Sequence, residues 1–131
     1  MASYFQLLGA VFAGLAVAAG AFGSHGLKDV LSPERLAVFE TAVRYQMYHA
    51  LALFILGAVL SRDQSPAFRR AAWSFAVGIV LFSGSLYAIT LTGMRWFGAI
   101  TPIGGVAFLI GWIFVGVGAW KQQTGPSRME R

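Results

Sequence analysis

The sequence predicts an all-α integral membrane protein: a four-transmembrane-helix bundle with an interfacial helical extension before the second span. Hydrophobic residues make up 57% of the 131 residues and charged residues only 11%, against roughly 25% charged residues in an average globular chain. The charged residues also fall in short gaps between long apolar runs. A small soluble domain needs more polar residues to cover its surface. The composition therefore excludes an ordinary cytosolic enzyme and a disordered chain.

The gaps between charged residues define the predicted spans. A helix needs about 20 apolar residues to cross a hydrocarbon core of about 30 Å, and four apolar runs approach or exceed that length. The runs must be helical, because lipid offers the backbone no hydrogen-bond partner. We predict one membrane domain over residues 1–121, with spans at about 5–24, 44–60, 71–91 and 97–120, and a disordered cytoplasmic tail over residues 122–131.

The second helix is predicted to begin well before its membrane span. Ser32, Pro33 and Glu34 form a helix-start signature: a hydroxyl N-cap, a proline in the first turn and an acid near the positive end of the helix dipole. Nothing interrupts the helix from there to Leu60. Residues 33–44 mix apolar and charged residues, which is typical of an interfacial segment. Within it, Glu40 and Arg44 are spaced for an i, i+4 interfacial ion pair.

The first apolar run ends in a glycine-rich segment. Gly23 and Gly26 flank His25, and they predict a helix C-cap in which glycine takes a positive φ. The run also contains Ala16-Val17-Ala18, a small-x-small pattern typical of a signal-peptide cleavage site. No lysine or arginine precedes Lys28, so the positive region of a signal peptide is missing and a span is favoured.

Glycine is abundant in this apolar chain, with 16 residues. In lipid, helices associate through close packing of small residues rather than through the hydrophobic effect. Small residues recur at i, i+4 spacing along the first run, at Ala10, Gly14 and Ala18 for example. This pattern predicts tight packing within the bundle, and the same stripes could also serve an oligomer interface.

The charges predict orientation and exclude several functions. With four spans both ends of the chain share a side, and that side holds six basic residues against four on the other. The bias favours cytoplasmic termini.

The net charge of +5 is scattered between spans rather than gathered in a stripe, so no nucleic-acid partner is predicted. The absence of cysteine excludes disulfides, thiolate metal sites and a cysteine nucleophile.

Polar side chains within the spans are the candidate site residues, because burying them in a bilayer is costly. Since successive spans alternate in direction, these residues share one leaflet, the outer one under the predicted topology. The candidate ligand-binding set is His25, Tyr45, Gln46, His49, Ser83, Ser85, Tyr87 and Thr101.

Four interpretations of this set stay open. His25 and His49 could ligate a haem iron, although two histidines would leave a zinc site incomplete. An ion pathway would need an acid inside the spans, and there is none. A small-molecule or lipid-headgroup pocket is the third. Interhelical hydrogen bonding, worth about 0.6 kcal/mol per contact on average, is favoured. No metal site or catalytic residue is predicted; no cofactor is predicted either, with haem and quinone left open.

Four motifs in order resemble a known family. They are Ala19-Gly20-Ala21-Phe22-Gly23-Ser24-His25-Gly26-Leu27, Tyr45-Gln46 with His49, Phe82-Ser83-Gly84-Ser85-Leu86-Tyr87, and Thr101-Pro102-Ile103-Gly104-Gly105, closed by Gly111-Trp112. The chain resembles the small bacterial inner-membrane family called YgdD- or YwdK-like, or domain of unknown function 423. Ser24 departs from the alanine usual there. The resemblance implies a four-helix, multi-pass protein of the bacterial inner membrane and no established activity.

The sequence thus favours a non-enzymatic membrane protein that is a structural or accessory component of a larger complex. The alternative is a small-molecule or lipid binder, or a transporter, that uses the polar set in the outer leaflet. The expected partners are the lipid bilayer and either a second copy of the chain or another subunit of a membrane complex.

Overall fold

The protein is helical throughout the part of the chain that the computed structural model describes, residues 1–125. Four helical units are long and apolar enough to cross a membrane: Ala2–Leu27, Pro33–Leu60, Pro66–Thr92 and Arg95–Thr124. The predicted four-span, all-α fold is confirmed. The elements are α1 (Ala2–Phe22), η1 (Gly23–Leu27), α2 (Pro33–Leu60), α3 (Pro66–Gly78), η2 (Ile79–Ser83), α4 (Gly84–Thr92), η3 (Arg95–Ala99) and α5 (Thr101–Thr124).

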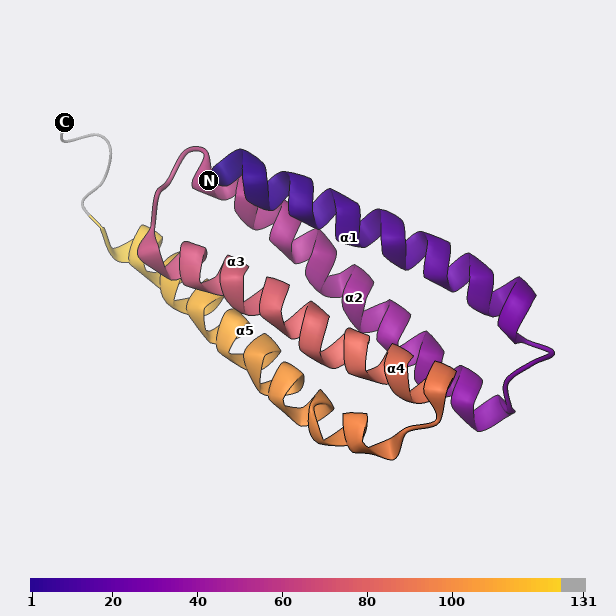
Figure 1. Cartoon of the computed structure of the whole chain (residues 1–131). Helices are drawn as coiled ribbons and strands as arrows, with labels where there is room; N and C mark the ends of the chain where they lie inside the picture. The colour runs from indigo at the N-terminus through magenta and orange to yellow at the C-terminus, as the bar shows by residue number, and fades with distance from the viewer. Residues whose placement is uncertain (126–131) are drawn as a thin grey trace.

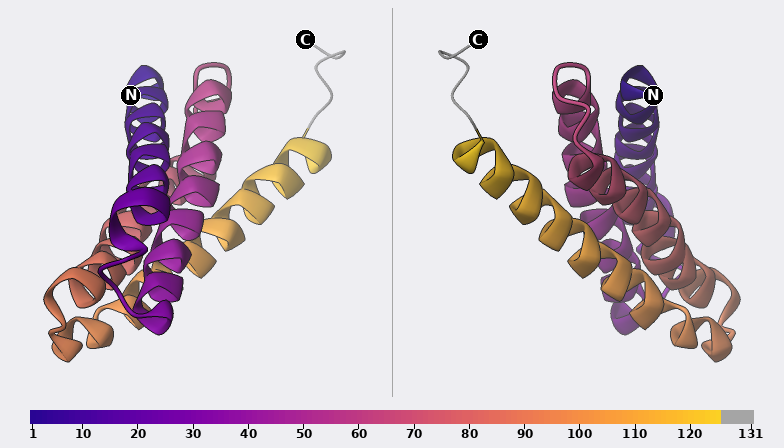
Figure 2. Two further views of the ribbon diagram at one scale, coloured as in Figure 1. Left: turned by 90° about the vertical axis from the view of Figure 1, so that its right-hand side faces the viewer. Right: turned by 90° about the vertical axis from the view of Figure 1, so that its left-hand side faces the viewer.

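The four units pack as two antiparallel hairpins (Figure 1). The first hairpin is α1 with α2, and the second is α3, η2 and α4 with α5. The hairpins cross at an angle, and α5 diverges from α2 toward the end where the chain begins (Figure 2). The chain begins and α5 ends at the same end of the molecule, which we call the terminal end. The connections 28–32 and 93–100 lie at the opposite end.

The start of α2 forms as its sequence predicts. The Ser32 hydroxyl accepts a hydrogen bond from the backbone N–H of Arg35 at 3.3 Å, and Pro33 occupies the first turn. The guanidinium of Arg35 donates to the carbonyl of Thr90 at 2.5 Å, near the end of α4, where a cation is favoured by the helix dipole. The interfacial extension of α2 is thereby attached to the second hairpin.

Two π-helical segments interrupt the first and third spans, and the pattern of apolar residues predicts neither. Residues Gly23–Leu27 continue α1 as a π-helix, and Ile79–Ser83 joins α3 to α4 in the same way. Gly23 has φ −59°, and in the described residues only Gly93 has a positive φ, at 74°. The predicted glycine C-cap after α1 is therefore wrong: the helix widens there instead of stopping. The left-handed cap occurs at Gly93, after α4.

Glycines hold α3 and α5 at close range. A Cβ atom added to Gly111 would lie 2.5 Å from the Phe75 ring, and one added to Gly118 would lie 2.5 Å from the Phe68 ring. Both phenylalanines are buried. Because each ring occupies the space that a side chain would need, glycine fixes the spacing of the second hairpin. The predicted role of small residues in packing is borne out here. Gly14, in a predicted stripe of α1, has no atom within 4 Å of such a Cβ and lies exposed.

The helices extend beyond the predicted spans. The first apolar unit begins at Ala2 and the third at Pro66, and Pro102 lies in the first turn of α5, where proline is tolerated without a kink. The helix α5 runs to Thr124, so residues 122–124 of the predicted tail are helical. Residues 126–131 of the predicted tail lie outside the described residues.

Candidate functional site

Gln46 connects three helices. It lies on α2 with only 5% of its surface exposed. Its side-chain amide donates to the carbonyl of Phe12 on α1 at 2.8 Å, and its oxygen accepts a hydrogen bond from the hydroxyl of Tyr87 on α4 at 2.8 Å. Both ends of the amide are therefore occupied, and two of the predicted site residues, Gln46 and Tyr87, meet across the hairpins.

His49, one turn further along α2, uses both ring nitrogens. The indole N–H of Trp112 on α5 lies 3.1 Å from Nε2, and Nδ1 lies 2.7 Å from the carbonyl of Tyr45. An indole nitrogen can only donate, so Nε2 must accept and the proton must reside on Nδ1, which donates to the carbonyl. The contacts thus assign a neutral imidazole of one tautomer that joins α2 to α5.

Aromatic rings enclose this imidazole. The Phe108 ring stacks on it, with centroids 3.6 Å apart and planes 10° from parallel, and the Phe75 ring meets it edge-on at 5.2 Å. His49 is 5% exposed. A histidine with both nitrogens bonded and both sides covered has no lone pair to offer a haem iron unless the packing is broken.

The serines of the third span and the threonine of the fourth form a second junction. The Ser83 hydroxyl, in η2, donates to the carbonyl of Ala42 on α2 at 2.7 Å. The hydroxyls of Ser85 and Thr101 lie 2.6 Å apart and join α4 to α5. One turn later α5 touches the backbone of η2: a Cβ added to Gly104 would overlap the Phe82 nitrogen and lie 2.7 Å from its Cα. The third and fourth sequence motifs therefore meet at one helix crossing.

Two predicted site residues do not join this network. His25 lies in η1 with its side chain exposed, and the ring makes no side-chain hydrogen bond in the described part of the chain. Tyr45 contributes its backbone carbonyl, while its side chain is 40% exposed and packs on Phe82 at a centroid distance of 4.8 Å. The structure does not bring His25 and His49 together: Gly23 of η1 packs beside Phe39, ten residues before His49 on α2, which corresponds to about 15 Å along the helix at 1.5 Å per residue.

The predicted interfacial pair has different contacts. Both Glu40 and Arg44 are exposed on α2, and the Arg44 guanidinium donates to the hydroxyl of Thr41 at 3.3 Å. Among the described residues no ion pair joins the two side chains in this structure.

Three important contributors were not among the predicted site residues. Trp112 and Phe108 complete the environment of His49, and Arg35 reaches α4 from the start of α2. The two aromatic residues lie at i, i+4 on the face of α5 that also carries Gly104 and Gly111. Phe108 and the two glycines are buried, whereas Trp112 is partly exposed. That periodicity in the sequence could have placed the rings beside the second and third spans.

The polar groups of the network are bonded within the protein. Among the residues that the structure describes, every buried side-chain nitrogen or oxygen has a hydrogen-bond partner, and no group of three or more histidine or acidic side chains is placed to hold a metal ion. The polar groups bond to one another or to the backbone. The arrangement therefore fits interhelical hydrogen bonding best among the four interpretations.

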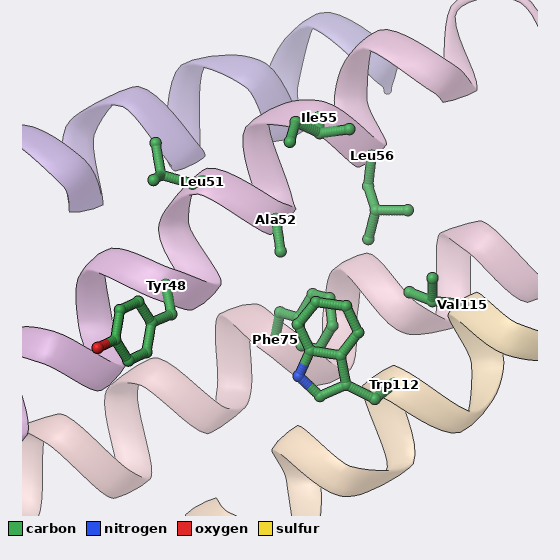
Figure 3. Close-up of a pocket in the computed structure, with 8 residues that line it drawn as sticks. All are labelled: Tyr48, Leu51, Ala52, Ile55, Leu56, Phe75, Trp112 and Val115. Carbon is green, nitrogen blue, oxygen red and sulfur yellow. The ribbon is translucent and has the colours of Figure 1, made fainter.

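An apolar crevice lies beside the network, where α5 diverges from α2 (Figure 3). Its volume is about 250 Å³, and Phe75 of α3 lies between the two helices. The lining residues are Tyr48, Leu51, Ala52, Ile55, Leu56, Phe75, Trp112 and Val115. Tyr48, Ile55 and Trp112 are each about half exposed or more. The crevice is thus open at the surface of the bundle.

Comparison with known proteins identifies the family. The model of DUF423, described as a protein of unknown function, matches residues 19–105. A UPF0382 membrane protein of Staphylococcus saprophyticus is 49% identical over 117 residues, covering 89% of this chain and 97% of the relative. The UPF0382 membrane protein YwdK of Bacillus subtilis is 48% identical over 118 residues, covering 89% and 96%. No solved structure matches the chain. With four helices of spanning length and relatives named as membrane proteins, the chain is a multi-pass membrane protein that belongs to the DUF423 family.

Proposed function

We propose that the protein is a non-enzymatic accessory subunit that binds a transmembrane helix of another protein in the bacterial inner membrane. The observation that carries the proposal is the closed polar network. Both ends of the Gln46 amide bond to other helices, and the two ring nitrogens of His49 bond to Trp112 of α5 and to the Tyr45 carbonyl of α2 itself. Because these polar groups are already bonded within the protein, a neighbouring membrane protein would contact an apolar surface instead of reactive groups.

The crevice between α2 and α5 is the proposed contact surface. Pockets for small molecules carry a few placed polar groups that orient the ligand, whereas every residue that lines this crevice is aliphatic or aromatic. The small side chain of Ala52 lies between larger neighbours, so another backbone can approach there, as small residues allow in membrane helix pairs. An apolar helix that inserts a side chain beside Phe75 suits this shape.

A photo-reactive residue tests the surface. Replacing Ile55, which is 60% exposed in the crevice, with a photo-reactive amino acid should give a cross-link to one membrane protein in native membranes. Val17 of α1 is similarly exposed, at 62%, and lies outside the crevice; the same replacement there should give no such product. The cross-linked protein should belong to a complex whose abundance or composition changes when this protein is deleted. Cross-links to lipid alone, or a deletion that leaves all membrane complexes intact, would reject the proposal.

The proposal includes an orientation with both ends of the chain in the cytoplasm. Six basic residues on the terminal side against four on the opposite side support it. The chain lacks cysteine, so a single introduced thiol reports one position. Val30→Cys, 74% exposed at the opposite end, should react with an impermeant maleimide in spheroplasts. Gln123→Cys, at the exposed end of α5, should react only after the membrane is permeabilised. The reverse labelling pattern would show that the orientation is inverted.

A further inference from the structure

A second pocket, with two charged residues in its lining, lies at the opposite end of the molecule from the termini, away from the crevice. It has a volume of about 250 Å³ and lies between the end of the first helical unit and the first turns of α2. The residues that matter in its lining are Gly20, Gly23, Ser24, Phe39, Glu40 and Arg44. The pocket therefore combines one acid and one base with walls that carry few side chains.

Glycines bring α1 and η1 close to α2 beside this pocket. Gly23 packs on the ring of Phe39, where an added Cβ would lie 3.0 Å from the nearest ring carbon, and an added Cβ at Gly20 would lie 3.3 Å from Val43. The wall contributed by α1 and η1 is thus mostly backbone, with the Ser24 hydroxyl bonded to the Gly20 carbonyl at 3.0 Å. A small charged group can approach α2 here without displacing a side chain.

The two charges are available to such a group. Glu40 and Arg44 lie one turn apart on α2, both exposed, and both line the pocket. The arginine donates to the neutral hydroxyl of Thr41 at 3.3 Å, which leaves other N–H groups of its guanidinium unused. A guanidinium is well suited to phosphate, since its donors match two phosphate oxygens at once.

The order of the charges along α2 matches one class of lipid. The helix runs from the interfacial extension into the apolar span, so Glu40 lies about 6 Å farther from the bilayer centre than Arg44, at 1.5 Å per residue. In a phospholipid with an ethanolamine headgroup the phosphate is nearer the acyl chains and the ammonium lies beyond it. We propose that this pocket binds a phosphoethanolamine headgroup, with Arg44 on the phosphate and Glu40 on the ammonium. This site is independent of the proposed subunit role.

Native mass spectrometry of the full-length protein tests the assignment. The purified protein is mixed with phosphatidylethanolamine or phosphatidylglycerol of the same acyl chains. The wild type should retain the ethanolamine lipid several-fold more than the glycerol lipid. Glu40→Gln should abolish that preference while leaving phosphatidylglycerol bound, and Arg44→Gln should reduce retention of both. Arg95→Gln removes the same charge from an exposed position on η3 and should change nothing.

Two additions separate the outcomes. Free phosphoethanolamine in excess should displace the lipid if the headgroup alone is recognised; retention despite this competitor would show that the acyl chains are needed as well. The double variant E40R/R44E keeps the net charge but reverses its order, and it should lose the preference. If Arg44→Gln fails to fold by circular dichroism, Glu40→Gln alone decides. Equal retention of the two lipids by the wild type, or an unchanged preference in Glu40→Gln, would overturn the proposal.

Discussion

Gly104→Ala should be among the most damaging single-methyl changes in the chain. The added Cβ would overlap the backbone nitrogen of Phe82 and lie 2.7 Å from its Cα. Backbone atoms of η2 cannot rotate away as a side chain can, so α5 must move and the bond between Ser85 and Thr101 must stretch. Overpacking of this kind costs about 1–3 kcal/mol. The free energy of unfolding, measured by titration with dodecyl sulfate in mixed micelles, should fall by that amount.

Gly116→Ala is the matched control on the same helix. An added Cβ there meets no atom within 4 Å, so the substitution should be neutral or should stabilise the helix by up to about 1 kcal/mol, the usual difference between alanine and glycine. Equal effects at Gly104 and Gly116 would mean that α5 does not cross η2 at backbone contact.

Gln46→Leu should cost the second largest amount. The leucine keeps the bulk of the side chain but leaves the Tyr87 hydroxyl without its acceptor and removes the donor to Phe12. A hydrogen-bonding group left unsatisfied away from water costs about 1–3 kcal/mol, while interhelical bonds in membranes average about 0.6 kcal/mol. We therefore expect a loss of about 1–2 kcal/mol in the same unfolding measurement.

A double-mutant cycle isolates that bond. Tyr87→Phe alone removes the donor, and the double variant with Gln46→Leu leaves no orphaned hydroxyl. The double variant should lose less stability than the sum of the two single variants, with a coupling energy of at least about 0.5 kcal/mol, as for residues in direct contact. Strictly additive losses would show that Gln46 and Tyr87 do not interact.

The positions of the four helices could be predicted from the sequence because charge is so costly in a bilayer. The uncharged run between Arg44 and Arg62 leaves no other location for the second span, and Ser32 caps α2 by the hydrogen bond that its sequence signature predicts. The π-helical segments could not be predicted in this way. A π turn depends on which neighbours pack against it, as Ser83 against Ala42 and Phe82 against Gly104, and apolar periodicity does not encode those partners.

For the candidate site, the sequence predicted which polar residues lie within the apolar spans, but not the level of each one along the bundle or its direction around the helix. Alternation of the spans predicts one leaflet for His25 and His49, but η1 packs beside Phe39, ten residues before His49 on α2. His25 is also exposed, whereas His49 is buried and bonded to Trp112 of α5. The same limit applied to the small-residue stripes. Spacing alone could not separate Gly14, which contacts nothing, from Gly9, where an added Cβ would lie 2.6 Å from the Phe54 nitrogen.

The chain order of the hydrogen bonds between the hairpins has a consequence for biogenesis. The N-terminal hairpin enters the membrane first, because synthesis proceeds from that end. At that stage the Gln46 oxygen and the His49 Nε2 atom lack the donors that they later receive from Tyr87 and Trp112. The early hairpin thus exposes two unmatched acceptors to lipid, which favours docking of the next hairpin over release into the bilayer. A nascent chain truncated before α4 would be an incomplete product that membrane quality-control proteases could distinguish from the finished one.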